Sequence, residues 1–183
     1  MILTVTPDPG PDRTYGLPAP ARGAVLRAGA DRVDPGGKGV NVSRAVVPLG
    51  GPEGEQLARL LGERGIEAAG VPIAGSTRVN ITLVEPDGTL TKVNAAGPEI
   101  SGAEAEALPE TARARSADAD WIACCGSLPR GLRPEWYAEL VRRVHRAGAR
   151  IALDTSGRAL TAALGERPDV VKPNAGELAE AVG

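Results

Sequence analysis

The second half of the chain alternates short apolar runs with segments of helical periodicity, and this alternation constrains the fold of the 183 residues most strongly. The runs 121–125, 150–154 and 169–172 have the length and composition of buried strands. Helical patterns separate them; the first lies between Pro134 and Gly148. Strand, helix, strand order favours right-handed crossovers and a parallel sheet with helices on both faces. We therefore predict an α/β fold.

Two other segments depart from this alternation. Residues 78–84 alternate polar and apolar side chains, turn at 85–88 and return along 89–94, which is the pattern of a β-hairpin. The stretch 25–33 is a further candidate strand. Together they predict a small antiparallel β-lid beside the main sheet. The predicted division places lid segments at 13–34 and 77–96, inserted in an α/β core of 1–12, 35–76 and 97–183.

Composition excludes several classes of function. The net charge is −2, aromatic residues make up 2% and Phe is absent, so neither a basic face nor stacking platforms favour a nucleic-acid partner. No apolar run approaches the roughly 20 residues of a membrane span, and residues 1–5 do not resemble a signal peptide, so we expect a cytoplasmic protein without membrane contact. We interpret the adjacent Cys124 and Cys125 as buried thiols, and we expect the single histidine, His145, to lie on the surface.

Glycines, a lysine and an asparagine are concentrated in residues 34–45, on a loop predicted to open a helix. Glycine allows the backbone to approach a ligand closely, a helix N-terminus attracts anions, and Lys38 adds a full charge. The spacing fits neither the P-loop nor the dinucleotide fingerprint. Taken alone, the segment is either an anion-binding loop or an ordinary Pro-Gly-Gly turn with a solvated lysine.

Polar or glycine-rich loops follow four of the predicted strands. Because the carboxyl ends of parallel strands meet at one edge of a sheet, these loops are expected to line one ligand site. They are residues 6–12, 126–131, 154–157 and 173–174.

Six short motifs, in the same order, resemble those of the ribokinase-like carbohydrate kinases of the phosphofructokinase-B group, and most of all the bacterial 1-phosphofructokinases. They are Thr6-Pro7-Asp8-Pro9 with Asp12-Arg13-Thr14, Pro35-Gly36-Gly37-Lys38-Gly39-Val40-Asn41, Thr77-Arg78-Val79-Asn80, Gly126-Ser127-Leu128-Pro129, Asp154-Thr155-Ser156-Gly157 and Lys172-Pro173-Asn174. The resemblance covers nearly the whole chain. It implies a ribokinase-like three-layer sandwich with a mostly parallel central sheet and a β-lid, incomplete at the C-terminus.

The same resemblance implies an ATP- and Mg²⁺-dependent kinase that converts fructose 1-phosphate to fructose 1,6-bisphosphate. Tagatose 6-phosphate and fructose 6-phosphate are the alternative substrates, because pocket shape rather than motif sets that choice. A homodimer through the β-lid is an assembly that the resemblance leaves open.

The resemblance also assigns roles to individual residues. Asp12 would bind sugar hydroxyls, the glycine-rich loop would hold the sugar, and basic side chains would hold its phosphate. The sugar-phosphate candidates are Asp12, Gly37, Lys38, Asn41, Arg78, Arg27 and Ser127. Lys172, Asn174 and Glu177 match an element near the nucleotide phosphates, with Asn174 and Glu177 reaching Mg²⁺ through water. The alternatives are a solvated arginine on the hairpin, a turn-forming Ser127 and a solvated Glu177.

The chain departs from the family pattern at the catalytic element. The family carries a Gly-Ala-Gly-Asp segment, late in the sequence, whose aspartate takes the hydroxyl proton. Here the similar Ala28-Gly29-Ala30-Asp31 lies in the predicted lid, too early in the order. We therefore expect this chain to be inactive as a kinase and assign it no catalytic residue. The alternative function is a non-catalytic sugar-phosphate-binding module.

Two smaller departures concern the sugar-binding half. After Asn41 the family has a helix, a turn and a strand, of which roughly ten residues are missing here, and Pro48 argues against a central strand through Val46 and Val47. Asp8 stands where the family usually carries Asn. Its carboxylate would lie near Asp12 and weaken the binding of an anionic sugar.

Overall fold

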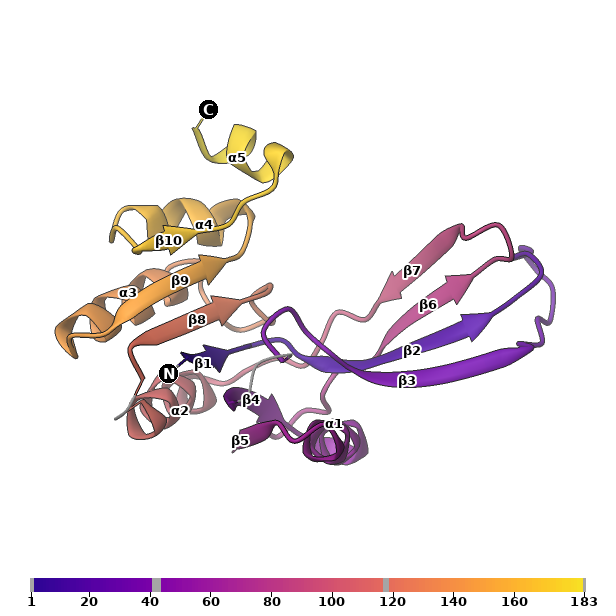
Figure 1. The fold of residues 1–183 in the computed structure, drawn as a ribbon, viewed down its shortest axis with the longest axis horizontal. Coiled ribbons are helices and arrows are strands. Elements are labelled where there is room, and N and C mark those ends of the chain that lie inside the picture. Colours follow the sequence, from indigo (N-terminus) through magenta and orange to yellow (C-terminus); the bar gives the residue numbers. More distant parts are fainter. Residues whose placement is uncertain (1, 41–43, 117–118, 183) are drawn as a thin grey trace.

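The computed structural model describes residues 2–40, 44–116 and 119–182, which form two sheets and five helices in the described part (Figure 1). The central sheet has six parallel strands in the order β10-β9-β8-β1-β4-β5. Their bounds are β1 Ile2–Val5, β4 Arg44–Leu49, β5 Glu67–Pro72, β8 Trp121–Cys125, β9 Arg150–Asp154 and β10 Val170–Val171. The prediction of an α/β fold with a mostly parallel sheet is confirmed.

Helices pack on both faces of the central sheet. They are α1 Gly51–Glu63, α2 Gly102–Arg115, α3 Trp136–Arg146, α4 Gly157–Leu164 and α5 Ala175–Val182. Side chains alternate along β4: Val46 joins the core cluster that contains Leu108 of α2, while Val47 joins the cluster that contains Leu57 of α1. The two helices therefore cover opposite faces of this strand. The predicted capping box that opens α2 is present, with Ser101 and Glu104 bonded reciprocally.

The predicted loss of a central strand near Pro48 is wrong, because β4 occupies an interior position between β1 and β5. The carbonyl of Val46 accepts a hydrogen bond from the Thr6 N–H, so the backbone polar groups of Val46 point toward β1. The backbone of Pro48, two residues later, points toward the same side, but the ladder between β1 and β4 has already ended at the pair of Val5 and Val46. The N–H that proline lacks is therefore not needed at this position.

The expectation of a helix directly after the glycine-rich loop is also wrong. Residues 38–40 form a turn and the described chain resumes at Arg44 as the first residue of β4. The predicted site residue Asn41 lies outside the described residues. No helix dipole therefore supports an anion at this loop in the described part of the chain, and Lys38 is the charge that it contributes.

A second sheet, here called the lid sheet, projects from the carboxyl edge of the central sheet (Figure 1). Its order is β3-β2-β6-β7, with β2 Gly10–Gly16, β3 Ala30–Gly36, β6 Asn80–Val84 and β7 Leu90–Asn94. The hairpin of β6 and β7 is as predicted, whereas the lid is mixed rather than antiparallel because β2 pairs with β6 in parallel. The strand expected at 25–33 begins at Ala30 and continues through Asp34-Pro35-Gly36.

The remaining sequence expectations concern single side chains and membrane segments. Cys124 is fully buried and Cys125 half-buried. The side chain of His145 is partly exposed, and its Nε2 lies 3.1 Å from Asp169 Oδ2. None of the described helices combines the length and the apolar character that a membrane crossing requires.

Candidate functional site

A cavity of about 490 Å³ lies where the loops at the carboxyl edge of the central sheet meet the lid sheet. Three of the four predicted loops contribute to it, the exception being 173–174. The loop residues are Thr6, Asp8, Gly37, Lys38, Gly126, Ser127, Thr155 and Ser156, and the lid sheet with its approach adds Asp12, Arg78, Asn80, Thr82, Lys92 and Asn94. The volume falls within the range of small-ligand sites, and the walls are dominated by hydrogen-bonding groups.

Asp8, Arg78 and Ser127 form a buried unit in the wall of this cavity. The Arg78 guanidinium lies 2.8 Å from Asp8 Oδ2, and the Ser127 hydroxyl donates to the same oxygen at 3.0 Å. The exposed fractions of the side chains are 4% for Asp8 and 16% for Arg78. Burial raises the pKa of Asp8 above its ordinary value, and Arg78 and Ser127 oppose that rise. The charge of Arg78 is therefore largely balanced by Asp8.

Asp12 is held toward the cavity by its neighbour across the β2 and β6 pair. Asn80 Nδ2 donates to Asp12 Oδ1 at 2.9 Å, while Asn80 Oδ1 is buried without a hydrogen-bond partner. A Cβ placed on Gly36 would overlap the Asp12 carboxylate, so glycine at this position is what allows the carboxylate to keep its place. Asp12 and Asn80 together offer the acceptors and donors that sugar hydroxyls use.

Lys38 also lines the cavity, and it contacts Asp154 at the end of β9. Its Nζ donates to Asp154 Oδ1 at 2.8 Å, and Lys172 Nζ lies 3.5 Å from the other carboxylate oxygen. The hydrogen bond to Asp154 raises the pKa of Lys38 above its ordinary value. Lys38 is therefore a protonated side chain at neutral pH, shared between Asp154 and the cavity.

The structure brings five of the predicted sugar-phosphate candidates to this cavity: Asp12, Gly37, Lys38, Arg78 and Ser127. Arg27 is exposed in the connection between β2 and β3 and is not among the residues that line it. Their roles in ligand binding remain predictions.

Two of the three predicted nucleotide residues, Asn174 and Glu177, bond to each other in a local turn, and their role toward a nucleotide stays a prediction. Asn174 Oδ1 accepts from the Glu177 N–H at 2.9 Å, and Glu177 Oε2 accepts from the Asn174 N–H at 2.8 Å, which is a capping arrangement at the start of α5. No group of three or more His, Cys, Asp or Glu side chains within 2–40, 44–116 and 119–182 is arranged to hold a metal ion. The water-mediated Mg²⁺ role of Asn174 and Glu177 stays a prediction, and we derive no step through it.

Sequence reasoning missed the polar face of the hairpin. Asn80 pairs with Asn94 and Thr82 with Lys92 across β6 and β7, and all four residues line the cavity. The alternation that predicted the hairpin also separates this polar face from an apolar one that contains Ile81. The alternation in the sequence therefore contained the signal, and the polar face of the hairpin could have been interpreted as part of a ligand site.

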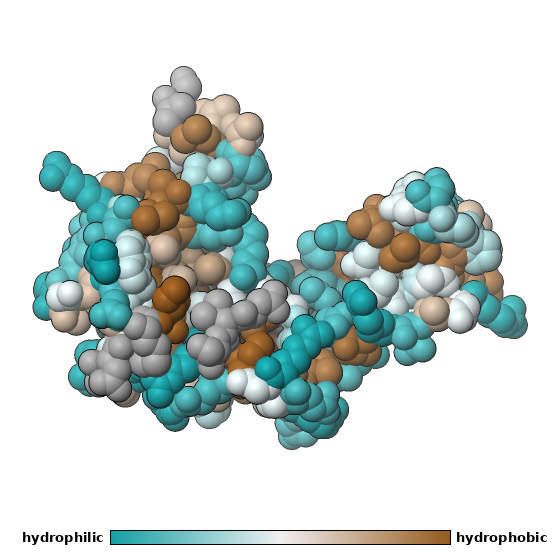
Figure 2. Space-filling view, in the orientation of Figure 1, coloured by the Kyte–Doolittle hydropathy of each residue, from teal (hydrophilic) through white to brown (hydrophobic). Residues whose placement is uncertain are grey.

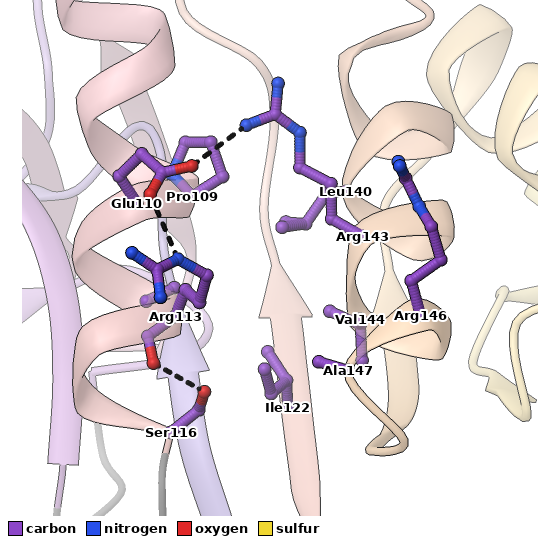
Figure 3. Close-up of a pocket in the computed structure, with 11 residues that line it drawn as sticks. Pro109, Glu110, Arg113, Ser116, Ile122, Leu140, Arg143, Val144, Arg146 and Ala147 are labelled. Carbon is purple, nitrogen blue, oxygen red and sulfur yellow. Dashed lines mark hydrogen bonds and ion pairs between the residues drawn. The ribbon is translucent and has the colours of Figure 1, made fainter.

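A second cavity of about 490 Å³ lies between α2 and α3, with Ile122 of β8 at its floor (Figure 3). Its floor is apolar, and its charged rim is occupied by ion pairs: Arg143 contacts Glu106 and Glu110, and Arg113 contacts Glu110. It therefore lacks the free hydrogen-bonding groups of the cavity at the lid.

The sequence profile of the pfkB family carbohydrate kinases matches residues 12–183. The chain belongs to this family. A 1-phosphofructokinase of Rhodobacter capsulatus is 41% identical over an alignment of 194 residues, which covers 100% of this chain and 61% of the relative. An ATP-dependent 6-phosphofructokinase isozyme 2 of Mycobacterium tuberculosis is 33% identical over an alignment of 193 residues, which covers 100% of this chain and 57% of the relative.

Solved structures of pfkB kinases superimpose closely on the chain. Phosphofructokinase-2 from Escherichia coli in complex with fructose-6-phosphate has a TM-score of 0.92 at 30% identity, covering 99% of this chain and 63% of that one. A possible 1-phosphofructokinase from Thermotoga maritima has a TM-score of 0.84 at 27% identity, covering 94% and 60%. The chain thus spans about three fifths of the length of its relatives. The ribokinase-like fold of the described residues is confirmed.

Proposed function

We propose that the chain binds a sugar phosphate in the cavity at the lid and supplies the sugar-binding half of a 1-phosphofructokinase-type site. The observation that supports the proposal is the cavity itself, in which Asp12 with Asn80 would meet sugar hydroxyls and basic side chains would offer charge to a phosphate. The 41% identity to the R. capsulatus 1-phosphofructokinase favours fructose 1-phosphate. Tagatose 6-phosphate and fructose 6-phosphate remain the alternative ligands.

The residues of this chain would bind and orient the sugar phosphate. The Asp12 carboxylate accepts hydrogen bonds from hydroxyls, and its orientation is fixed by Asn80 and by the space at Gly36. Lid strands β6 and β7 would exclude water from one side. Kinases of the pfkB family use ATP and a divalent metal, and the family's Gly-Ala-Gly-Asp element has no counterpart at the matching place in the described sequence. We therefore propose that this chain alone binds sugar phosphate without turnover.

Calorimetric titration of the 183-residue chain tests the binding proposal. Fructose 1-phosphate is expected to bind, and Asp12→Asn is expected to weaken it by about tenfold or more because a charged hydrogen-bond acceptor is lost. Asp31→Asn is the matched control, since Asp31 is an exposed carboxylate on β3 away from the cavity. Absence of saturable binding by all three sugar phosphates to a folded sample would refute the proposal.

A coupled assay for ADP tests the turnover proposal. We expect no ADP formation dependent on fructose 1-phosphate, which is the behaviour of a non-catalytic binding module. Turnover that Asp12→Asn abolishes would establish that the chain is an active kinase and would overturn the proposed inactivity.

We further propose a homodimer through the lid sheet. Val93 of the edge strand β7 is 55% exposed and lies on the face of the lid sheet opposite to the cavity-lining Lys92 and Asn94, and Figure 2 shows apolar surface on this lobe, at the right of the view. A structure of E. coli phosphofructokinase-2 is described as a tetrameric inhibited form. Sedimentation of the wild type and of Val93→Glu tests the interface, and an unchanged mass in the variant would refute it. The cytoplasm is the proposed location, which cell fractionation tests.

A further inference from the structure

The second cavity, between α2 and α3, is here called the helix crevice, and none of the described residues that line it also lines the cavity at the lid. Short side chains lie on both of its walls: Ala112 and Ser116 on α2, and Ala147 on α3. They are too short to fill the space between the helices, so about 490 Å³ stays open above Ile122 of β8 (Figure 3). A single turn of an α-helix occupies roughly 500 Å³, so the crevice suits a small molecule better than a docked helix.

Helices α2 and α3 are bonded to each other beside the helix crevice. Pro109 has no N–H, so the carbonyl of Ala105, one turn earlier in α2, receives no helical hydrogen bond from it. Trp136 Nε1, at the start of α3, donates to this carbonyl at 3.1 Å. Because the two helices are held together in the free protein, the crevice is a standing feature of the fold rather than one that a ligand must open.

Guanidinium groups outnumber carboxylates at the rim of the helix crevice. Arg143 contacts Glu106 at 2.7 Å and Glu110 at 3.5 Å, and Arg113 contacts Glu110 at 3.0 Å. Arg146, three residues after Arg143 on α3, makes no ion pair within the described part of the chain, and its Nε donates to a backbone carbonyl of its own helix. Three guanidinium groups therefore meet two carboxylates, and the surplus positive charge lies at Arg146, beside an apolar floor.

We propose that the helix crevice binds an amphiphilic anion, that is, a small molecule with one apolar chain and one terminal carboxylate or phosphate. Leu140 and Val144 of α3 point into the crevice above Ile122 (Figure 3), and the apolar chain would lie on these three side chains. Each methylene that is buried there strengthens binding about fourfold. The anion would lie on the Arg146 guanidinium, whose parallel N–H donors match a carboxylate or a phosphate.

Neither part of the helix crevice selects such a ligand alone. An exposed arginine binds a small anion weakly, because water solvates both partners. The apolar floor alone would accept a neutral chain as readily as a charged one. The site is separate from the cavity at the lid, so this inference and the proposed binding of a sugar phosphate are tested independently.

Calorimetric titration of the 183-residue chain with octanoate, 1-octanol and acetate tests both parts of the proposal. Octanoate is expected to bind saturably and about tenfold or more tighter than octanol, which has the same chain without the charge. Acetate, which has the charge without the chain, is expected to show no saturable binding. Absence of saturable octanoate binding to a folded sample overturns the proposal, and so does octanol or acetate binding as tight as that of octanoate.

Two variants locate the ligand in the helix crevice. Arg146→Gln is expected to weaken octanoate by about tenfold or more, the size of a charge-assisted hydrogen bond, and to leave octanol unchanged. Ala147→Leu places a larger apolar side chain at the wall of the crevice and is expected to weaken both ligands. Arg142→Gln is the matched control on the same helix: it removes an arginine that pairs with Glu166 away from the crevice, and octanoate affinity is expected to change by less than about twofold. Octanoate affinity within twofold of wild type in either Arg146→Gln or Ala147→Leu overturns the proposal.

Discussion

Removal of the Arg78 charge tests how the buried wall of the cavity is stabilised. Arg78→Gln leaves Asp8, whose side chain is 4% exposed, without its cation. Breaking a buried ion pair costs about 3–5 kcal/mol, and the 16% exposure of Arg78 places this one at the low end of that range, about 3 kcal/mol. For a chain of this length that corresponds to a fall in Tm of about 6–12 °C.

Urea unfolding followed by the fluorescence of the two tryptophans, of which Trp136 is buried, provides the measurement. The double variant Asp8→Asn, Arg78→Gln replaces both charges, so its free energy of unfolding is expected to return to within about 1 kcal/mol of wild type. Arg113→Gln is the control, because it breaks an ion pair with Glu110 that is exposed on both sides and is worth less than about 1 kcal/mol. A loss below about 1 kcal/mol in Arg78→Gln, or a double variant as unstable as the single one, would refute the reasoning.

The pH dependence of the same variant has a definite sign. Burial raises the pKa of Asp8 above its ordinary value of 3.8, and loss of Arg78 removes a contribution that lowers it. Between pH 3.8 and the raised pKa the folded state binds more protons than the unfolded state, so the free energy of unfolding falls as the pH rises. The deficit of Arg78→Gln relative to wild type is thus expected to be smaller at pH 4 than at pH 7. A deficit that is the same at both pH values would contradict the assignment to Asp8.

Three further predictions concern local features. Gly36→Ala is expected to displace the Asp12 carboxylate and weaken fructose 1-phosphate by about tenfold in a titration, whereas Gly29→Ala, which meets no atom within 4 Å, leaves it unchanged. Ser101→Ala removes the cap of α2 and is expected to cost about 1 kcal/mol in urea unfolding. Leu140→Ala creates a cavity beneath α3 and is expected to cost about 3 kcal/mol in the same assay; a cost below 1 kcal/mol would show that the helix does not anchor the core.

The parallel sheet could be predicted because its strands carry their own local pattern. The apolar runs 121–125 and 150–154 are bounded by turns and became β8 and β9 with the predicted bounds. The prediction at Pro48 was wrong. Proline is excluded from a central strand only where the neighbouring strand needs a backbone N–H at that position. The neighbouring strand β1 ends at Val5, which pairs with Val46, so no hydrogen bond is required from residue 48. The residues around Pro48 carry no information about where β1 ends, because β1 lies more than 40 residues earlier in the sequence.

The site was predictable to a similar degree. The loops after the strands meet at one edge, as the strand order required, and they bring Lys38 and Ser127 to one cavity. The ion pair of Asp8 with Arg78 could not be derived, since it depends on how the lid sheet packs against the main sheet. Asn174 and Glu177 have two roles compatible with the same spacing, and the structure shows them as a local cap.

The parallel pairing of β2 with β6 has a consequence for the order of folding. Asp12 aligns with Asn80, so this ladder closes a loop of almost seventy residues before it gains its first contact, whereas the β6 and β7 hairpin is local. Every residue of β7 is exposed. We expect amide hydrogens of the lid sheet to exchange with solvent before those of β8 and β9, and the lid to form last in refolding. The part of the molecule that would recognise the ligand is then the part whose formation ligand binding can promote.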